Sequence, residues 1–144
     1  MAQPITYKGT VYPWHCDHMG HMNVMWYTGK MDEASWQLFS SLGLTPAYLK
    51  SSGRGMAALE INTRYLAELV AGDVVSVRTR VTEILKDKII KFSHELMRDT
   101  DGTVAAISEL TAIHMDTAAR RSCAFEQRIR ESITNLITQH KAAT

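Results

Sequence analysis

One long helical segment that is followed mainly by strand-like segments is the feature that most constrains the fold of this chain. From Asn23 to Leu42 apolar positions recur at helical spacing, and Gly29 is the only Gly or Pro in the segment. Aromatic residues widen the apolar surface beyond one stripe, at Trp26, Trp36 and Phe39. Polar residues mark another side, at Lys30, Glu33 and Gln37. We therefore expect a buried central helix with Asn23 as its N-cap.

Most of the remaining chain reads as strands joined by short turns. We expect strands over Tyr7–Trp14, Met56–Tyr65, Val74–Leu85, Ile89–Arg98 and Thr103–Met115. Short connections between the last four strands make them antiparallel. Further helices are expected at 45–50 and at 126–139. The chain is thus α+β, with a five-stranded antiparallel sheet that has to wrap the long helix.

Finer expectations concern three of these segments. Residues 51–55 contain two Ser and two Gly and read as a flexible turn. Alternating apolar and polar residues from Val74 to Val81 predict a strand with one buried face. The segment Thr103–Met115 is rich in Ala, Ile and Leu, so we expect it to be a central strand that is covered on both faces.

Length and charge exclude several classes of function. A chain of 144 residues is long enough for one domain, which we expect to span residues 1–144. With 16 Lys and Arg against 15 Asp and Glu, no overall field favours nucleic acid or an anionic membrane. No apolar run approaches the roughly 20 residues that cross a bilayer. The chain shows no signal peptide pattern and no disulfide or zinc spacing of its two cysteines, so a cytoplasmic protein is expected.

Residues 15–27 hold the densest collection of groups that can transfer protons, attack or coordinate. This stretch lies between a predicted strand and the predicted long helix, where loops commonly present functional groups. Asp17 can activate water or attack an acyl carbon. The free N–H groups near Val24 to Tyr27 can stabilise a developing oxyanion. A purely structural alternative is that Asp17 and Asn23 cap the helix.

Two other chemistries remain open for the same stretch. His15, His18 and His21 could bind a metal, with Cys16 or Asp17 as a further ligand. Equal threefold spacing converges on one ion only in a tight helical turn, which Gly20 disfavours. Cys16 could be a nucleophile activated by histidine, although a small buried apolar role suits it better.

Aromatic, methionine and basic residues suggest binding functions. An aromatic box for a quaternary ammonium group could be formed by Trp14, Trp26, Tyr27 and Trp36, unless these residues simply fill the core. An adaptable acyl pocket could be lined by Met19, Met22, Met25 and Met31. Phosphates could be held by some of Lys86, Lys88, Lys91, Arg98, Arg120, Arg121, Arg128 and Arg130, each of which is as readily explained as a solvated surface residue.

The motif resembles that of the hot-dog acyl-CoA thioesterases of the 4-hydroxybenzoyl-CoA thioesterase type. The matching residues are Asp17, Gly20-His21, Asn23 and Tyr27, followed by Glu33-Ala34, Glu60-Ile61, Tyr65-Leu66, Gly72-Asp73-Val74, Asp101-Gly102, Ala105-Ala106 and Met115-Asp116. The resemblance covers about residues 7 to 117. His15 and Val24 depart from the usual pattern, as does the missing proline after Leu66. The run around Asp17 also looks like that of the betainyl-CoA thioesterases of carnitine breakdown, whose trimethylammonium group would suit an aromatic cluster.

The resemblance implies a hot-dog fold, a homodimer that could pair into a homotetramer, and hydrolysis of a small acyl-CoA to a free acid and coenzyme A. No separate cofactor or metal is then expected, because coenzyme A is part of the substrate. The implied catalytic residues are Asp17, His21, Asn23 and Tyr27. We expect the acyl group to contact Trp14, Met25 and Trp26. Competing functions are a non-catalytic module that binds acyl or quaternary ammonium ligands and a metal-dependent hydrolase that uses the three histidines.

Overall fold

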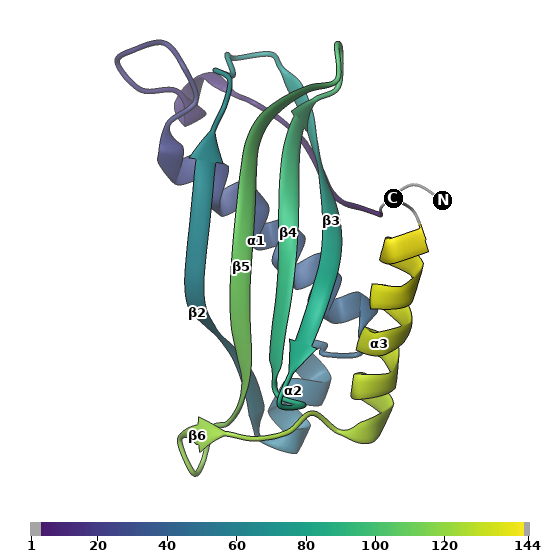
Figure 1. Ribbon diagram of the computed structural model, residues 1–144. Coiled ribbons are helices and arrows are strands. Elements are labelled where there is room, and N and C mark those ends of the chain that lie inside the picture. Colours follow the sequence, from purple (N-terminus) through teal and green to yellow (C-terminus); the bar gives the residue numbers. More distant parts are fainter. Residues whose placement is uncertain (1–3, 143–144) are drawn as a thin grey trace.

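A curved antiparallel sheet with a long helix along one face forms the body of the computed structural model (Figure 1). The structure describes residues 4–142, so the outermost residues of the predicted domain lie outside the described range. The strands are β1 (Ile5–Thr10), β2 (Arg54–Tyr65), β3 (Val74–Leu85), β4 (Ile89–Arg98), β5 (Thr103–Asp116) and β6 (Arg121–Ser122). Five of them run in the order β1-β3-β4-β5-β2, and the two-residue β6 pairs with β5. The predicted α+β class and hot-dog layout are confirmed.

Helix α1 (Val24–Ser41) lies along this sheet and matches the predicted central helix. The side chain of Asn23 caps it by accepting a hydrogen bond from the Met25 N–H at 2.9 Å. The helix ends before Gly43, whose positive φ of 92° is readily available only to glycine. The buried face of α1 comprises Tyr27, Lys30, Met31, Ala34, Ser35, Leu38 and Phe39. Periodicity thus identified the covered face, apart from Lys30, which is buried, and Trp36, which is 44% exposed although it was expected to widen the covered surface.

Lys30 was expected on the polar side of α1 but is buried. Its ammonium group donates to the hydroxyl of Tyr7 at 3.0 Å and to the carbonyl of Thr10 at 3.3 Å. Both acceptors come from β1, which lies against this part of the helix. A buried ammonium group needs such acceptors, and here the long side chain reaches them.

The first strand is shorter than predicted. It ends at Thr10, and Pro13–His15 form a short 3-10 helix instead of a strand. Proline has no N–H to donate, and the Tyr12 N–H donates to Nδ1 of His15 at 2.9 Å rather than to a neighbouring strand. Tyr12 and Trp14, two of the aromatic residues that favoured a strand, therefore lie in this turn.

Strand β2 forms one edge of the sheet. It pairs only with β5 among the described residues 4–142, which leaves its other side without a partner strand. Arg54 and Gly55 belong to β2, and Ser51 and Ser52 belong to helix α2 (Pro46–Ser52), so the predicted flexible turn shrinks to Gly53. Strand β5 is central, as predicted, but Glu109 on its outer face is exposed, so the strand is not covered on both faces.

Helix α3 (Gln127–Ala142) packs beside β3 (Figure 1). Strand β1 pairs with β3 only as far as Arg78, and beyond it the Val81 N–H donates to Nδ1 of His140 at 2.8 Å. Ile129 and Ile133 of α3, together with Phe125 just before the helix, complete one of two buried clusters under the sheet. No helix within residues 4–142 is long and apolar enough to cross a membrane.

Another buried histidine, His94, lies between α1 and the sheet. His94 of β4 is 0% exposed, and its Nε2 lies 2.8 Å from the hydroxyl of Ser35. Its Nδ1 lies 2.8 Å from the hydroxyl of Thr79, which in turn contacts the hydroxyl of Thr6 at 2.6 Å. Burial lowers the pKa of His94 from 6.5 to about 4. The imidazole is therefore held neutral inside the core.

Candidate active site

A tight turn before α1 presents the predicted catalytic carboxylate. Cys16 and Met22 pair as an isolated antiparallel bridge, and the Asp17 N–H donates to the His21 carbonyl at 3.1 Å. Gly20 has a φ of 80° and closes the turn by donating to the Asp17 carbonyl at 3.0 Å. This geometry needs a residue that tolerates positive φ, which explains the glycine in the motif.

The carboxylate of Asp17 is held by two hydrogen bonds. The Asn23 side-chain amide donates to Oδ2 at 3.0 Å, and the Met19 N–H donates to Oδ1 at 2.9 Å. The hydrogen bond from Asn23, and then that from Met19, lowers the pKa of Asp17 below its ordinary value. Because Asn23 also caps α1 through its carbonyl oxygen, one side chain fixes Asp17 relative to the first turn of the helix.

A cavity of about 330 Å³ opens beside this carboxylate. It is lined by Asp17, Met19, His21, Met22, Val24, Tyr27, Tyr65, Leu66, Ala67 and Glu68. These residues come from the turn, from the first turn of α1, and from the end of β2 and the segment that follows it. Val24 is the first residue of α1, and the first N–H groups of a helix have no acceptor within the helix. The cavity therefore combines a carboxylate with the positive end of a helix dipole.

His21, in the turn before α1, and Tyr27, in the first turn of α1, both contact the segment after β2, which forms the far wall of the cavity. Nε2 of His21 lies 3.0 Å from Oε2 of Glu68. The hydroxyl of Tyr27 donates to the Ala67 carbonyl at 2.9 Å, and burial raises the pKa of this hydroxyl. Tyr27 is itself buried, with a ring that meets Tyr65 edge to face at a centroid distance of 5.2 Å. The Tyr27 hydroxyl is thus already hydrogen-bonded to the backbone of the cavity wall.

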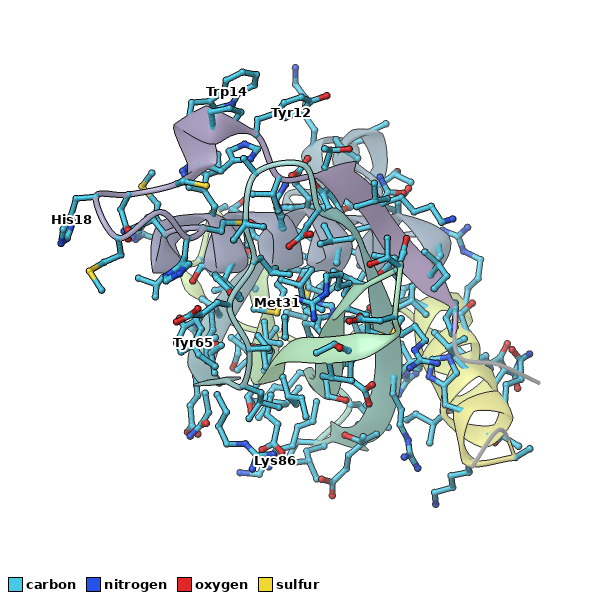
Figure 2. All side chains as sticks on the ribbon, turned by 90° about the horizontal axis from the view of Figure 1, so that it is seen from above. Tyr12, Trp14, His18, Met31, Tyr65 and Lys86 are labelled. Carbon is cyan, nitrogen blue, oxygen red and sulfur yellow. The ribbon has the colours of Figure 1, made fainter. Side chains whose placement is uncertain are left out.

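The three residues predicted to contact the acyl group are absent from the cavity wall. Trp14 is 68% exposed and stacks on Tyr12 with ring centroids 4.5 Å apart. Met25 is 62% exposed, and Trp26 packs on His15 at a centroid distance of 4.5 Å. Figure 2 shows Tyr12 and Trp14 above α1 and Tyr65 below it. The aromatic cluster and the cavity therefore lie on different sides of the helix start.

The histidines of the motif do not gather around one point. His15 is buried, and its Nδ1 accepts a hydrogen bond from the Tyr12 N–H. Burial, followed by the charge of Lys30, lowers the pKa of His15. His18 is exposed and occupies the tip of the turn in Figure 2, and His21 faces Glu68. Within residues 4–142 no group of three His, Cys, Asp or Glu side chains is arranged to hold a metal ion.

Sequence reasoning assigned no site role to Tyr65 or Glu68, although both line the cavity. They lie more than forty positions after Asp17 in the chain, and the match of Tyr65-Leu66 to the family pattern gave Tyr65 no role. Only the packing of the segment after β2 against α1 brings them to the site. The backbone bond from the Met22 N–H to the Leu69 carbonyl, at 2.7 Å, helps to fix this packing.

Comparisons with known proteins agree with this geometry. A sequence model of the thioesterase-like superfamily matches residues 11–133. A betainyl-CoA thioesterase of Pseudomonas aeruginosa is 28% identical over 143 residues, which cover 99% of this chain and 89% of that protein. An L-carnitine dehydrogenase/betainyl-CoA thioesterase of Agrobacterium fabrum is 29% identical over 125 residues, or 87% of this chain, and this match spans only 25% of that longer protein.

The solved structure of SAV2348 from Staphylococcus aureus, in complex with CoA, has a TM-score of 0.88 to this chain. It is 25% identical and covers 96% of this chain and 87% of its own. The similarities confirm the predicted hot-dog fold and the predicted class of enzyme, a thioester hydrolase. Because the family match spans most of its length, the chain belongs to the thioesterase-like superfamily.

Proposed function

We propose that this chain hydrolyses a small acyl-CoA to the free acid and coenzyme A, and that betainyl-CoA is its substrate. The observation that carries the proposal is the carboxylate of Asp17, fixed at the mouth of a cavity beside the first turn of α1. Two relatives at 28% and 29% identity are named for betainyl-CoA, which supports the choice of acyl group.

The geometry suits attack on a thioester carbonyl. If the thioester carbonyl oxygen lies near the Val24 N–H, the negative charge that develops on this oxygen during attack is stabilised by the positive end of the helix dipole. An ionised carboxylate has about four acceptor positions, and the bonds from Asn23 and Met19 use only two of them. Asp17 can therefore take a proton from water as the water attacks, or attack the carbon itself. In the first route the carbon–sulfur bond breaks and the coenzyme A thiolate takes the proton held by Asp17. In the second route the thiolate leaves an anhydride between the acyl group and Asp17, which water then hydrolyses to the free acid while supplying the proton.

The other motif residues take supporting roles in this proposal. Asn23 orients Asp17 and keeps it ionised, and His21 orients the water on the opposite wall. Tyr27 holds the Ala67 backbone and so keeps the cavity open at a fixed width. No separate cofactor enters the reaction.

A second copy of the chain is proposed to pair along the free edge of β2. This edge is twelve residues long and carries exposed apolar side chains, including Leu59 and Ile61. Long open edges of this kind invite strand pairing. Antiparallel pairing about a twofold axis would place the Arg54 end of one copy beside the Tyr65 end of the other.

Pairing of two copies would also supply basic groups to the cavity. Within one chain, the tip that carries Arg120 and Arg121 lies at the Arg54 end of β2, about 36 Å along the strand from Tyr65. In the paired form these arginines of one copy would approach the cavity of the other, where the phosphates of coenzyme A could be held. A solution mass measurement gives the number of copies and separates a dimer from a tetramer.

A panel of acyl-CoA thioesters tests the proposed activity. Release of free coenzyme A is followed with a thiol reagent for betainyl-CoA, several straight-chain thioesters and an aromatic thioester. The expected result is rapid release from betainyl-CoA that persists after treatment with a chelator. Binding without release would favour the non-catalytic module, and loss of release with the chelator would favour a metal-dependent hydrolase. Silence across the panel would overturn the proposal.

A further inference from the structure

Two side chains of the cavity wall have no role in the proposed attack. Tyr65 is the last residue of β2 and is 49% exposed. Glu68 follows in the next segment, with a side chain that is 72% exposed and a carboxylate turned toward His21. Both therefore present their functional parts to solvent at the cavity, where a substrate could meet them.

The ionisable groups on the cavity wall are predominantly acidic. Asp17 and Glu68 contribute two carboxylates, His21 contributes an imidazole, and no Lys or Arg lines the cavity. The guanidinium group of Arg98 donates to the Glu68 carbonyl at 3.3 Å. Its charge is already compensated by Asp101, at 2.9 Å. Within one chain, the side-chain charges of this wall therefore favour a cationic acyl group over an anionic one.

A quaternary ammonium group has no N–H, so hydrogen bonds cannot recognise it. Such groups are bound through aromatic rings and through the field of nearby carboxylates. The tryptophans that could have formed an aromatic box lie off the cavity wall, whereas Tyr65 lies on it, supported edge to face by Tyr27. The carboxylate of Glu68 already has His21 as its partner, so it can contribute field without needing a hydrogen bond from the ligand.

We infer that Tyr65 and Glu68 select acyl groups that carry a fixed positive charge. This inference rests on the proposed thioesterase function and adds the residues that set its specificity. Tyr65 supplies a ring against the cation, and Glu68 supplies the negative field. Asp17 remains the residue that acts on the thioester.

The test compares two substrates of nearly the same shape. Betainyl-CoA carries a trimethylammonium group, and 3,3-dimethylbutyryl-CoA carries a carbon atom in place of that nitrogen and has no charge. The wild-type chain is expected to show a kcat/KM at least about tenfold higher for the cationic thioester. The Glu68→Gln and Tyr65→Leu variants are each expected to reduce this ratio by about fivefold to tenfold. Tyr65→Phe keeps the ring and should keep the ratio.

The control is Glu109→Gln, which removes an exposed carboxylate from the outer face of β5, away from the cavity. Its kcat/KM for both thioesters should match that of the wild type. Equal rates of the two thioesters in the wild type would overturn the inference while leaving a thioesterase. An equal loss for both thioesters in Glu68→Gln would also overturn it, because Glu68 would then act only through His21. If neither thioester released coenzyme A, the proposed thioesterase function itself would be wrong.

Discussion

Helix α1 meets two groups of polar side chains whose composition is similar and whose surroundings are opposite. Before its first turn, Asp17 and His21 line an open cavity, and Asn23 donates a hydrogen bond to Asp17. Near its middle, Ser35 meets His94, which is sealed under the sheet with both ring nitrogens next to hydroxyl groups. The first group retains acceptor positions that face solvent. The second has none left, because the neighbours of the imidazole occupy both nitrogens.

This difference teaches which histidines and carboxylates can act on a substrate. A proton acceptor needs unused lone pairs and a route for the substrate, and only the group before α1 has both. His94 instead joins α1 to β3 and β4, and its removal should affect stability rather than chemistry. Substitutions in each group can break or sharpen that separation.

The largest expected effect on stability comes from His94→Ala. The variant leaves a cavity in the core and removes a partner from the hydroxyls of Ser35 and Thr79, so we expect a loss of about 3 kcal/mol in the free energy of unfolding. Urea denaturation measures this loss. The control His18→Ala changes an exposed imidazole and should stay within about 0.5 kcal/mol of the wild type. A similar loss in both variants would break the comparison.

Acid should destabilise the chain partly through the same residue. The pKa of His94 is about 4 in the folded chain and ordinarily 6.5, so the unfolded chain binds the extra proton between these values. Its contribution to stability is complete above pH 6.5 and is lost as pH falls toward 4, by up to about 3 kcal/mol. Unfolding measured over this range should show a shallower pH dependence for His94→Gln than for the wild type. Identical slopes would contradict a buried neutral imidazole.

Asn23 should show two smaller effects that can be separated. Asn23→Ala removes the cap of α1, at about 1 kcal/mol of unfolding free energy, and it removes the hydrogen bond to Asp17. The pKa of Asp17 then rises, so kcat/KM should begin to fall at a higher pH as the solution is acidified. Asn23→Ser retains a capping hydroxyl but lacks the amide, and it should restore stability without restoring the pH profile. If Asn23→Ser restored the wild-type pH profile of kcat/KM, the change in that profile would come from loss of the helix cap and not from loss of the hydrogen bond to Asp17.

The smallest expected effect belongs to Trp14→Ala. Because the indole lies on Tyr12 and outside the cavity, kcat/KM should remain within about threefold of the wild-type value. Steady-state coenzyme A release measures it. A larger loss would return Trp14 to the substrate site predicted from sequence.

Local patterns allowed much of the fold to be predicted. Helical spacing located α1, and turn residues located β3 and β4 at Val74–Leu85 and Ile89–Arg98. The aromatic run at Tyr12–Trp14 was misread as strand because Pro13 and the His15 side chain favour a turn. Lys30 was misread as exposed because its partners lie on β1, which a helical pattern cannot reveal.

The candidate site was predictable on one side only. Asp17, His21 and Asn23 are close in sequence, so the local pattern of residues is enough to group them. Tyr65 and Glu68 reach the same cavity through tertiary packing, which no spacing of residues in the sequence predicts. The acyl contacts assigned to Trp14, Met25 and Trp26 relied on closeness in sequence, whereas the helix start separates these residues from the cavity wall.

The most direct test of the proposed role of Asp17 is coenzyme A release by the Asp17→Asn variant, with unfolding measured in parallel. We expect at least about a hundredfold loss of kcat and an unfolding free energy within about 1.5 kcal/mol of the wild type, because Asn keeps one of the two acceptor oxygens of Asp17. Asp32→Asn, which changes an exposed carboxylate further along α1, should remain close to wild type in both measurements. Turnover by Asp17→Asn within a few fold of the wild-type rate would contradict a catalytic role and leave Asp17 as a structural residue of the turn.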